Sequence, residues 1–290
     1  MDGIAARTRT LTLRDGRCLA YAQWGPDEGD PVVYLHGALG SRLERHREDE
    51  DYRRLGVRLI TVDRPGHGLS SSHEDGTLQD FADDLEELLD HLGLLYAGVL
   101  GHGTGGLNVL AFAHRHPARV RVAGVVSGVG MIERPGGMEG LGKRVKRIYR
   151  NARSNPRRAG AEMRINVLAF RYRPSLAFRG IGNPTVTSNP EFQRRFREAL
   201  LEGARAGTGG FVSDIAISAG RWGFDPAEIP TPIYWWHGSD DAVSPLSHAQ
   251  YVIDQVPDAG LTVIDGGGHF MIHEEIESIL SSLSPRTLVN

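Results

Sequence analysis

Residues 99–106 read VLGHGTGG, a short apolar run that leads into a cluster of glycines. The apolar run predicts a buried β-strand that ends at Gly101, and the residues after Thr104 predict the start of an α-helix. A strand-to-helix turn this sharp holds its central residue, Gly103, in a strained backbone conformation above the sheet. Gly101 and Gly105 have no Cβ atom, so the strand and the helix can approach closely. The stretch therefore predicts an α/β fold with an exposed turn.

Further strands and helices alternate on both sides of this turn. The clearest helix is LQDFADDLEELLDHL at 78–92, whose leucines and phenylalanine form one apolar stripe. An Asp15-Gly16 pair between alternating residues of 11–24 predicts a β-hairpin. Strands that alternate with helices form parallel sheets with right-handed crossovers, so we expect a mostly parallel central sheet flanked by helices. The predicted strands of this sheet are 32–35, 57–62, 97–100, 120–126, 233–236 and 261–264.

The alternation stops between about residues 131 and 225. This stretch is rich in arginine, is interrupted by glycine and proline, and has more helical than strand character. We interpret 131–225 as an inserted, mainly helical cap over the carboxyl edge of the sheet, where open α/β folds bind ligands. Residues 1–130 and 226–290 would then form the core.

Basic residues are concentrated in the predicted cap. Residues 131–225 hold 18 Lys and Arg against 8 Asp and Glu, whereas the rest of the chain holds 15 against 28. Such an asymmetry can mark a surface for nucleic acid or membrane, and the alternative is a solvated helical face. The basic residues are scattered and are not interleaved with stacking aromatic side chains. We therefore expect a solvated face, with neither nucleic acid nor membrane as a partner.

The composition is typical of a soluble globular protein. The chain has 290 residues, a formal net charge of −3 and 40% hydrophobic residues. Its single cysteine, Cys18, excludes an intramolecular disulfide and a cysteine-based zinc site, and is typical of a reducing compartment. The first ten residues lack the apolar run of a signal peptide, and no stretch approaches the roughly 18 apolar residues of a spanning helix. We expect a cytoplasmic protein, and a homo-oligomer stays open.

Five stretches together resemble motifs of the α/β-hydrolase-fold family, and the resemblance covers nearly the whole chain. The turn at 99–106 is similar to the family's G-x-S-x-G turn, which carries the nucleophile. LHGALGSRLE at 35–44 resembles its H-G loop, and TVDRPGHGLSS at 61–71 resembles its D-x-P-G-x-G-x-S segment. The stretch 222–245 ends in a pattern similar to H-G-x-x-D-x-x-x-P, and GGGHF at 266–270 resembles the final histidine loop.

The resemblance implies a role for several positions. Asp241 would be the catalytic acid, with Asp240 the less favoured choice, and His269 would be the catalytic histidine. The backbone N–H groups of Ala38 and Thr104 would form the oxyanion hole. The chemistry explains these residue types. An imidazole must accept a proton and return it, and a carboxylate must orient the imidazole. N–H donors must stabilise the oxyanion.

Other residues of these loops are expected to line the substrate pocket. His102, directly before the centre of the turn, and Gly37 and Leu39 of the H-G loop are the candidates. We expect His36 and His67 to serve their loops structurally, since neither belongs to a recognisable metal-ligand motif. No metal site is predicted.

At the centre of the turn the family pattern requires an alcohol, and this sequence has Gly103. One interpretation is a serine hydrolase whose nucleophile has been replaced. A second is a serine-free enzyme in which His269, backed by Asp241, acts as a base in elimination, cyclisation or water activation. A third is a ligand-binding protein or receptor. We favour the first; loss of a triad serine removes about 10⁴–10⁶ of rate, so little esterase activity is expected.

The predicted ligand is a small, largely apolar ester, lactone or polyketide-like molecule. No cofactor is expected, because the chain has no Walker loop and GHGTGG at 101–106 lacks the spacing of a dinucleotide fingerprint. Apolar residues of the predicted cap could form the pocket wall or the cap's own core. These residues are Met131, Ile132, Met138, Leu141, Tyr149, Phe170, Tyr172 and Phe178.

Overall fold

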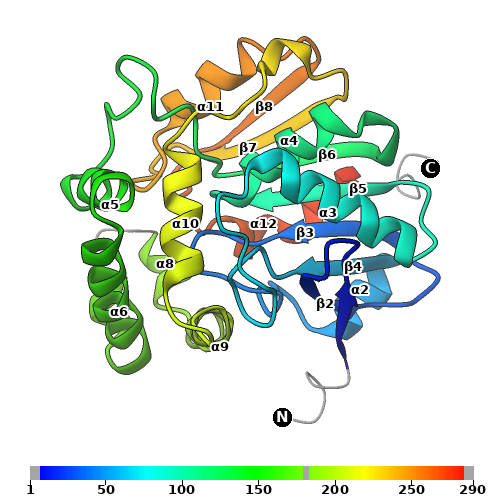
Figure 1. Cartoon of the computed structure of the whole chain (residues 1–290), viewed down its shortest axis with the longest axis horizontal. Helices are drawn as coiled ribbons and strands as arrows, with labels where there is room; N and C mark the ends of the chain where they lie inside the picture. Colours follow the sequence, from blue (N-terminus) through cyan, green and yellow to red (C-terminus); the bar gives the residue numbers. More distant parts are fainter. Residues whose placement is uncertain (1–6, 179–182, 284–290) are drawn as a thin grey trace.

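Eight strands form one mixed sheet in the computed structural model, which describes residues 7–178 and 183–283 (Figure 1). Their order across the sheet is β1-β2-β4-β3-β5-β6-β7-β8. β1 and β2 pair antiparallel, as do β2 and β4, and all other neighbours are parallel. The predicted mostly parallel sheet is confirmed. The strands are β1 (Thr8–Thr12), β2 (Cys18–Trp24), β3 (Asp30–Leu35), β4 (Val57–Val62), β5 (Ala97–His102), β6 (Val120–Val126), β7 (Ile233–Gly238) and β8 (Ala259–Ile264).

Helices cover both faces of the sheet. α3, α4 and α11 pack on one face and α2 and α12 pack on the other. Thr77 caps α3, because its side chain accepts a hydrogen bond from the Asp80 N–H. Within the described ranges, no helix combines the length and the apolar character needed to cross a bilayer. These helices are α2 (Asp49–Leu55), α3 (Leu78–His91), α4 (Gly105–Arg115), α11 (Leu246–Ile253) and α12 (Ile272–Leu283), with short 3₁₀ turns at Pro117–Arg119 and Pro226–Glu228.

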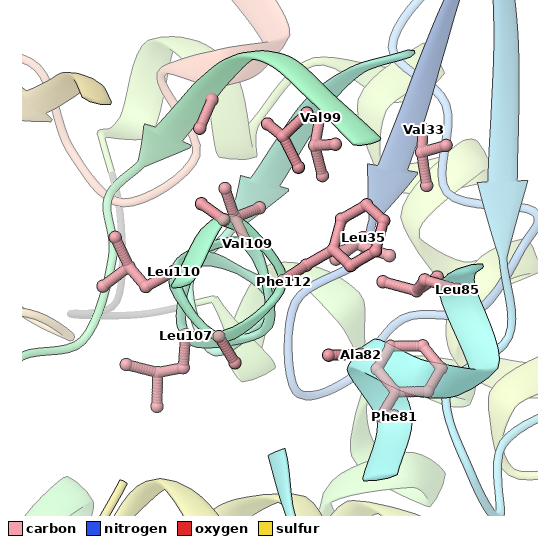
Figure 2. Packing of buried hydrophobic residues seen from close by; sticks show 14 of the residues in the cluster. Val33, Leu35, Phe81, Ala82, Leu85, Val99, Leu107, Val109, Leu110 and Phe112 are labelled. Carbon is pink, nitrogen blue, oxygen red and sulfur yellow. The ribbon is translucent and has the colours of Figure 1, made fainter. Parts of the chain in front are cut away.

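The central strands are apolar on both faces because both faces are covered. In β3, Val33 and Leu35 pack against α3 and α4, whereas Val32 and Tyr34 pack toward α2 and α12. Figure 2 shows the first set, with Phe112 of α4 between the strands and α3. Burial of each such side chain contributes about 1.5–3 kcal/mol relative to exposure. This core holds the carboxyl ends of the strands in fixed register.

The segment between β6 and β7 contains helices and, in its described part, no strand. Its buried residues form an apolar cluster of their own, which also includes Phe270 from the loop after β8. In Figure 1 these helices lie beside the sheet, with α5 and α6 at the margin of the molecule. The boundaries of a cap domain at 131–225 stay a prediction. The helices are α5 (Lys143–Ser154), α6 (Pro156–Tyr172), α7 (Pro174–Ala177), α8 (Pro184–Thr187), α9 (Pro190–Gly203) and α10 (Gly209–Ser218).

Candidate active site

The turn at 99–106 joins β5 to α4 directly. Gly103 has a φ of +56°, a left-handed conformation that favours glycine. Its N–H donates to the Val126 carbonyl at 2.9 Å, which ties the turn to the end of β6. A Cβ atom on Gly101 would lie 2.5 Å from the carbonyl group of Gly105, so this crossing of strand and helix needs glycine. The backbone therefore has the predicted sharp turn, with Gly103 at its tip.

Asp241 and His269 meet at the carboxyl ends of β7 and β8. One carboxylate oxygen of Asp241 accepts the N–H groups of Val243 and Ser244, at 2.8 and 2.9 Å. Its other oxygen lies 2.9 Å from Nδ1 of His269. Burial favours a raised pKa for Asp241, but the charge and hydrogen bond of His269 outweigh burial, and the pKa is lowered. Asp241 is therefore a buried carboxylate that orients the His269 ring.

The other ring nitrogen of His269 faces the turn. A Cβ atom placed on Gly103 would lie 3.4 Å from Nε2 of His269. Because Asp241 accepts the proton of Nδ1, Nε2 of the neutral imidazole presents a lone pair. Among the described residues, no group forms a hydrogen bond with this nitrogen. The structure thus brings together Gly103, Asp241 and His269, with a free basic nitrogen beside a turn that has no side chain.

The predicted oxyanion donors border the same space. Ala38 and Thr104 both line the cavity, and in the described part of the chain neither backbone N–H has a hydrogen-bond partner. Buried Arg64 joins their loops, because its Nη2 donates to the Gly37 carbonyl and to the Thr104 hydroxyl, each at 3.0 Å. Arg64 also pairs with Asp214 of α10. One arginine therefore connects the H-G loop, the turn and the helical segment.

A second histidine–carboxylate pair lies beside the first. Nδ1 of His102 is 3.3 Å from a carboxylate oxygen of Glu44, and its Nε2 is 2.9 Å from the backbone carbonyl of His269. The same Glu44 oxygen accepts the Tyr34 hydroxyl at 2.6 Å and the Gly37 N–H at 3.4 Å. The His102 and His269 rings have centroids 4.9 Å apart. Glu44 was not predicted from the sequence, although it closes the quoted H-G stretch at 35–44.

The partners of His102 determine where its protons lie. A carbonyl oxygen only accepts, so Nε2 must carry a proton, and the contact of Nδ1 with a carboxylate needs a second proton. Burial alone would lower the pKa of His102, but the hydrogen bond and charge of Glu44 outweigh it and the pKa is raised. Burial similarly opposes charge on Glu44, but His102 holds the pKa of this carboxyl well below its usual range. The pair is therefore a buried imidazolium and carboxylate at pH values below the raised pKa of His102.

A cavity of about 170 Å³ opens onto these groups. Gly37, Leu39 and His102 line it, as the sequence predicts, and most of the remaining wall is apolar or aromatic. Of the proposed wall residues, Tyr149 and Phe170 are found in this lining. Tyr172 is 65% exposed, so the expectation that it lies in the pocket wall or in the core of the cap is wrong. The aromatic lining residues are Tyr149, Phe170, Phe192, Phe196 and Phe270.

The remaining histidines of the motifs belong to their loops. His36 is buried, and its two ring nitrogens contact the Gly37 carbonyl at 2.7 Å and the Arg64 N–H at 3.2 Å. His67 is buried against Phe211, with ring centroids 5.1 Å apart. In residues 7–178 and 183–283, no three His, Cys, Asp or Glu side chains are grouped to hold a metal ion.

Comparison with known proteins agrees with the fold. The model of the alpha/beta hydrolase fold family matches residues 30–276. A non-heme chloroperoxidase from Streptomyces lividans is 31% identical over 83% of this chain and 84% of its own length. A bifunctional esterase/perhydrolase from Acinetobacter calcoaceticus is 28% identical over 94% of this chain and 97% of its own. The chain belongs to the α/β-hydrolase-fold family.

Solved structures show the same fold. A bromoperoxidase from Bacillus anthracis superimposes with a TM-score of 0.73 at 20% identity, covering 98% of this chain and 100% of that one. An esterase from Exiguobacterium antarcticum gives a TM-score of 0.71 at 19% identity, covering 94% of this chain and 97% of the esterase chain. At these identities the likeness establishes the fold alone.

Proposed function

We propose that this chain is an α/β-hydrolase-fold enzyme for small, largely apolar ester-like or lactone-like ligands, in which Gly103 occupies the place of the nucleophilic serine. The single observation that carries the proposal is the free Nε2 of His269, directed at the Gly103 turn and backed by buried Asp241. The apolar cavity wall supports the ligand class. The esterase and chloroperoxidase relatives support the reaction class.

Each group would keep its part of the chemistry except the nucleophile. The N–H groups of Ala38 and Thr104 would receive the carbonyl oxygen of the ligand, and His269 would be ready to accept a proton at Nε2. With hydrogen in place of a hydroxymethyl group at Gly103, no acyl-enzyme forms. The chain as it stands should bind ester-like ligands and hydrolyse them slowly. The oxyanion donors and binding alone still accelerate the reaction roughly 10³–10⁴-fold over the reaction in water.

A serine-free reaction is the second candidate, and the intact His269–Asp241 pair favours it. A base with one nitrogen oriented by a carboxylate and the other unpaired is ready to take a proton from water or from a substrate C–H or O–H group. The space that a serine side chain would fill is next to this nitrogen. A pure binding protein would have no use for such a base, so a receptor function is less well supported.

Restoring the hydroxyl tests the first candidate. Gly103→Ser should hydrolyse short p-nitrophenyl esters at least roughly 10³-fold faster than the unaltered chain, and it should react with a fluorophosphonate. Gly103→Ala is the matched control, because it adds the same Cβ atom in the same backbone conformation without a hydroxyl. If Gly103→Ser is folded and no more reactive than Gly103→Ala, the proposal of a replaced serine is wrong.

Removing the base tests the second candidate. In the unaltered chain, His269→Ala should lower residual p-nitrophenyl ester hydrolysis by roughly 10²–10⁴-fold if His269 activates water. Residual hydrolysis that is the same with and without His269 would contradict water activation. This measurement does not depend on the outcome for Gly103→Ser.

A further inference from the structure

The charge asymmetry of the chain resides mainly in one helical hairpin. Residues 143–173, which comprise α5, α6 and the residue after α6, hold 11 Lys and Arg and a single acid, Glu162. The rest of the chain holds 22 basic and 35 acidic residues. We call 143–173 the basic hairpin. Because the two parts carry opposite net charge, an anionic surface would attract the hairpin, repel the remainder and thus orient the molecule.

The exposed face of α6 carries a row of arginines. Arg157, Arg164 and Arg171 are seven residues apart, which places them along one side of the helix, and all three are exposed. In the described part of the chain none of them pairs with a carboxylate. The one acid of the hairpin, Glu162, is engaged by two other arginines. These three guanidinium groups are therefore available to a ligand outside the molecule.

Large apolar side chains lie directly beside this row. Ile165, Leu168 and Tyr172 are 67%, 52% and 65% exposed, and their spacing places them on the same side of α6. Exposed single hydrophobic residues are common, but three adjacent ones on a helix indicate a contact surface. Figure 1 shows α6 at the margin of the molecule, away from the sheet. The face is thus a protruding strip with an apolar half and a cationic half.

We propose that this face of α6 docks on an anionic lipid bilayer, with Ile165, Leu168 and Tyr172 inserted at the headgroup boundary and the arginines on lipid phosphates. An interfacial helix has this combination of apolar and basic side chains, and arginine reaches phosphate while its stem stays in apolar surroundings. A nucleic acid would use the arginines but would leave two aliphatic side chains in water. The proposed docking face differs from the solvated face that we expect from the sequence.

The inner faces of the same two helices line the cavity. Val145 and Tyr149 of α5 and Met163 and Phe170 of α6 are among its wall residues. A bilayer held against the outer face would therefore lie next to the cavity wall, and an apolar ligand could enter from the lipid. This last step rests on the proposed function, whereas docking itself does not.

Vesicle binding tests the docking. The full chain is mixed with large unilamellar vesicles of phosphatidylcholine, or of phosphatidylcholine with one-third phosphatidylglycerol, and bound protein is measured by flotation. We expect binding to the anionic vesicles that weakens as salt screens the charges, and little binding to the neutral ones. Absence of binding to the anionic vesicles at low salt would overturn the proposal, whatever the outcome for catalysis.

Two sets of variants separate the charged and apolar contributions. The triple variant R157Q/R164Q/R171Q should bind anionic vesicles roughly 100-fold more weakly. The three arginines near the surface contribute comparable factors to the binding constant, and these factors multiply. I165S/L168S should bind roughly tenfold more weakly while keeping its salt dependence. The controls are R14Q/R53Q/R54Q and L95S, which change exposed arginines and an exposed leucine outside the basic hairpin. All variants alter exposed side chains, and circular dichroism checks that each one is folded.

Other occupants of the face give different results. Unchanged vesicle binding in the triple variant would overturn the proposal. Binding of duplex DNA that the triple variant loses and I165S/L168S retains would assign the face to nucleic acid instead. Sedimentation showing a dimer that I165S/L168S disrupts, together with no vesicle binding, would assign it to a second copy of the chain.

Discussion

Two histidine–carboxylate pairs lie side by side at the cavity, and they differ in whether the histidine keeps a free ring nitrogen. In the first pair, Asp241 occupies Nδ1 of His269 and leaves Nε2 free beside Gly103. In the second pair, Glu44 occupies Nδ1 of His102, and the backbone carbonyl of His269 occupies Nε2. The difference teaches that residue type alone does not define a base. A histidine acts as a base only where one nitrogen is left for the substrate.

The second pair is therefore suited to hold the first in place. The His102 ring connects three parts of the site. It contacts the H-G loop through Glu44 and the final loop through the His269 carbonyl, and the backbone of β5 joins it to the turn. A Cβ atom on Gly37 would lie 3.1 Å from Nδ1 of His102, so the ring also packs closely on the H-G loop. We infer that His102 and Glu44 are positioning residues. Three measurements can sharpen or break this comparison.

The largest expected difference is between the two histidines. In the Gly103→Ser background, His269→Gln should lower kcat for p-nitrophenyl esters by roughly 10⁴–10⁶-fold, because it removes the base. His102→Gln should lower kcat by only about 10–100-fold with KM nearly unchanged, because it loosens the placement of His269. His116→Gln is the control: His116 contacts Asp83 at 2.7 Å, outside the cavity lining, and should leave kcat unchanged. Equal losses at His269 and His102 would end the distinction.

Substitution of the two carboxylates, Glu44 and Asp241, is expected to have an intermediate effect, on the pH dependence of stability. The raised pKa of His102 means that its pairing with Glu44 stabilises the fold fully below pH 6.5 and is lost as pH rises through that raised pKa. Glu44→Gln removes the countercharge, so burial should then lower the pKa of His102 and reverse this slope, with a loss of about 1–3 kcal/mol below pH 6.5. Urea unfolding across the pH range measures it.

Asp241 gives the contrasting pH dependence. Its pKa is lowered from 3.8, so its own contribution to stability is present above that pH and is lost only as pH falls through the lowered pKa. Asp241→Asn should therefore lower the free energy of unfolding at neutral pH. The unaltered chain should show this loss only in acid. If Glu44→Gln leaves the alkaline slope of the unaltered chain intact, His102 is not held as an imidazolium by Glu44.

The smallest expected effect concerns the turn between the two pairs. Gly103 has φ +56°, so Gly103→Ser and Gly103→Ala should each lower the free energy of unfolding by about 1 kcal/mol. The added Cβ atom would make an ordinary contact of 3.4 Å with Nε2 of His269, so no further cost is expected. Urea denaturation at neutral pH checks both variants. A loss several times larger would mean that the turn rearranges, and activity differences at Gly103 would then need another explanation.

Much of the core could be predicted because its strands are covered on both faces. β4 and β6 have the predicted bounds, and the hairpin turns near Asp15-Gly16 as expected. A strand buried on two sides is a continuous apolar run, which is easy to recognise. The helices between β6 and β7 have a less regular apolar pattern because they pack on each other and also line the cavity. Their order and lengths could not be predicted, and neither could the exposure of Tyr172.

The candidate site was predictable where its residues follow strands within a motif. Asp241 and His269 belong to such stretches, and parallel strands bring their loops to one edge. Glu44 has no such signal with respect to His102, since 58 residues separate the two and no local spacing relates them. Their contact exists only because β3 and β5 are neighbours in the sheet.

By itself, the sequence determined the alternation of strands and helices, the sharp turn with glycine at its tip and the order of acid and histidine. These properties follow from local periodicity and from the short-range geometry of the backbone. Tertiary structure alone decided which histidine keeps a free nitrogen, that Glu44 pairs with His102, and which side of α6 meets solvent. These properties depend on contacts between segments far apart in the chain, and the free energy of such contacts is set by burial and neighbouring charge.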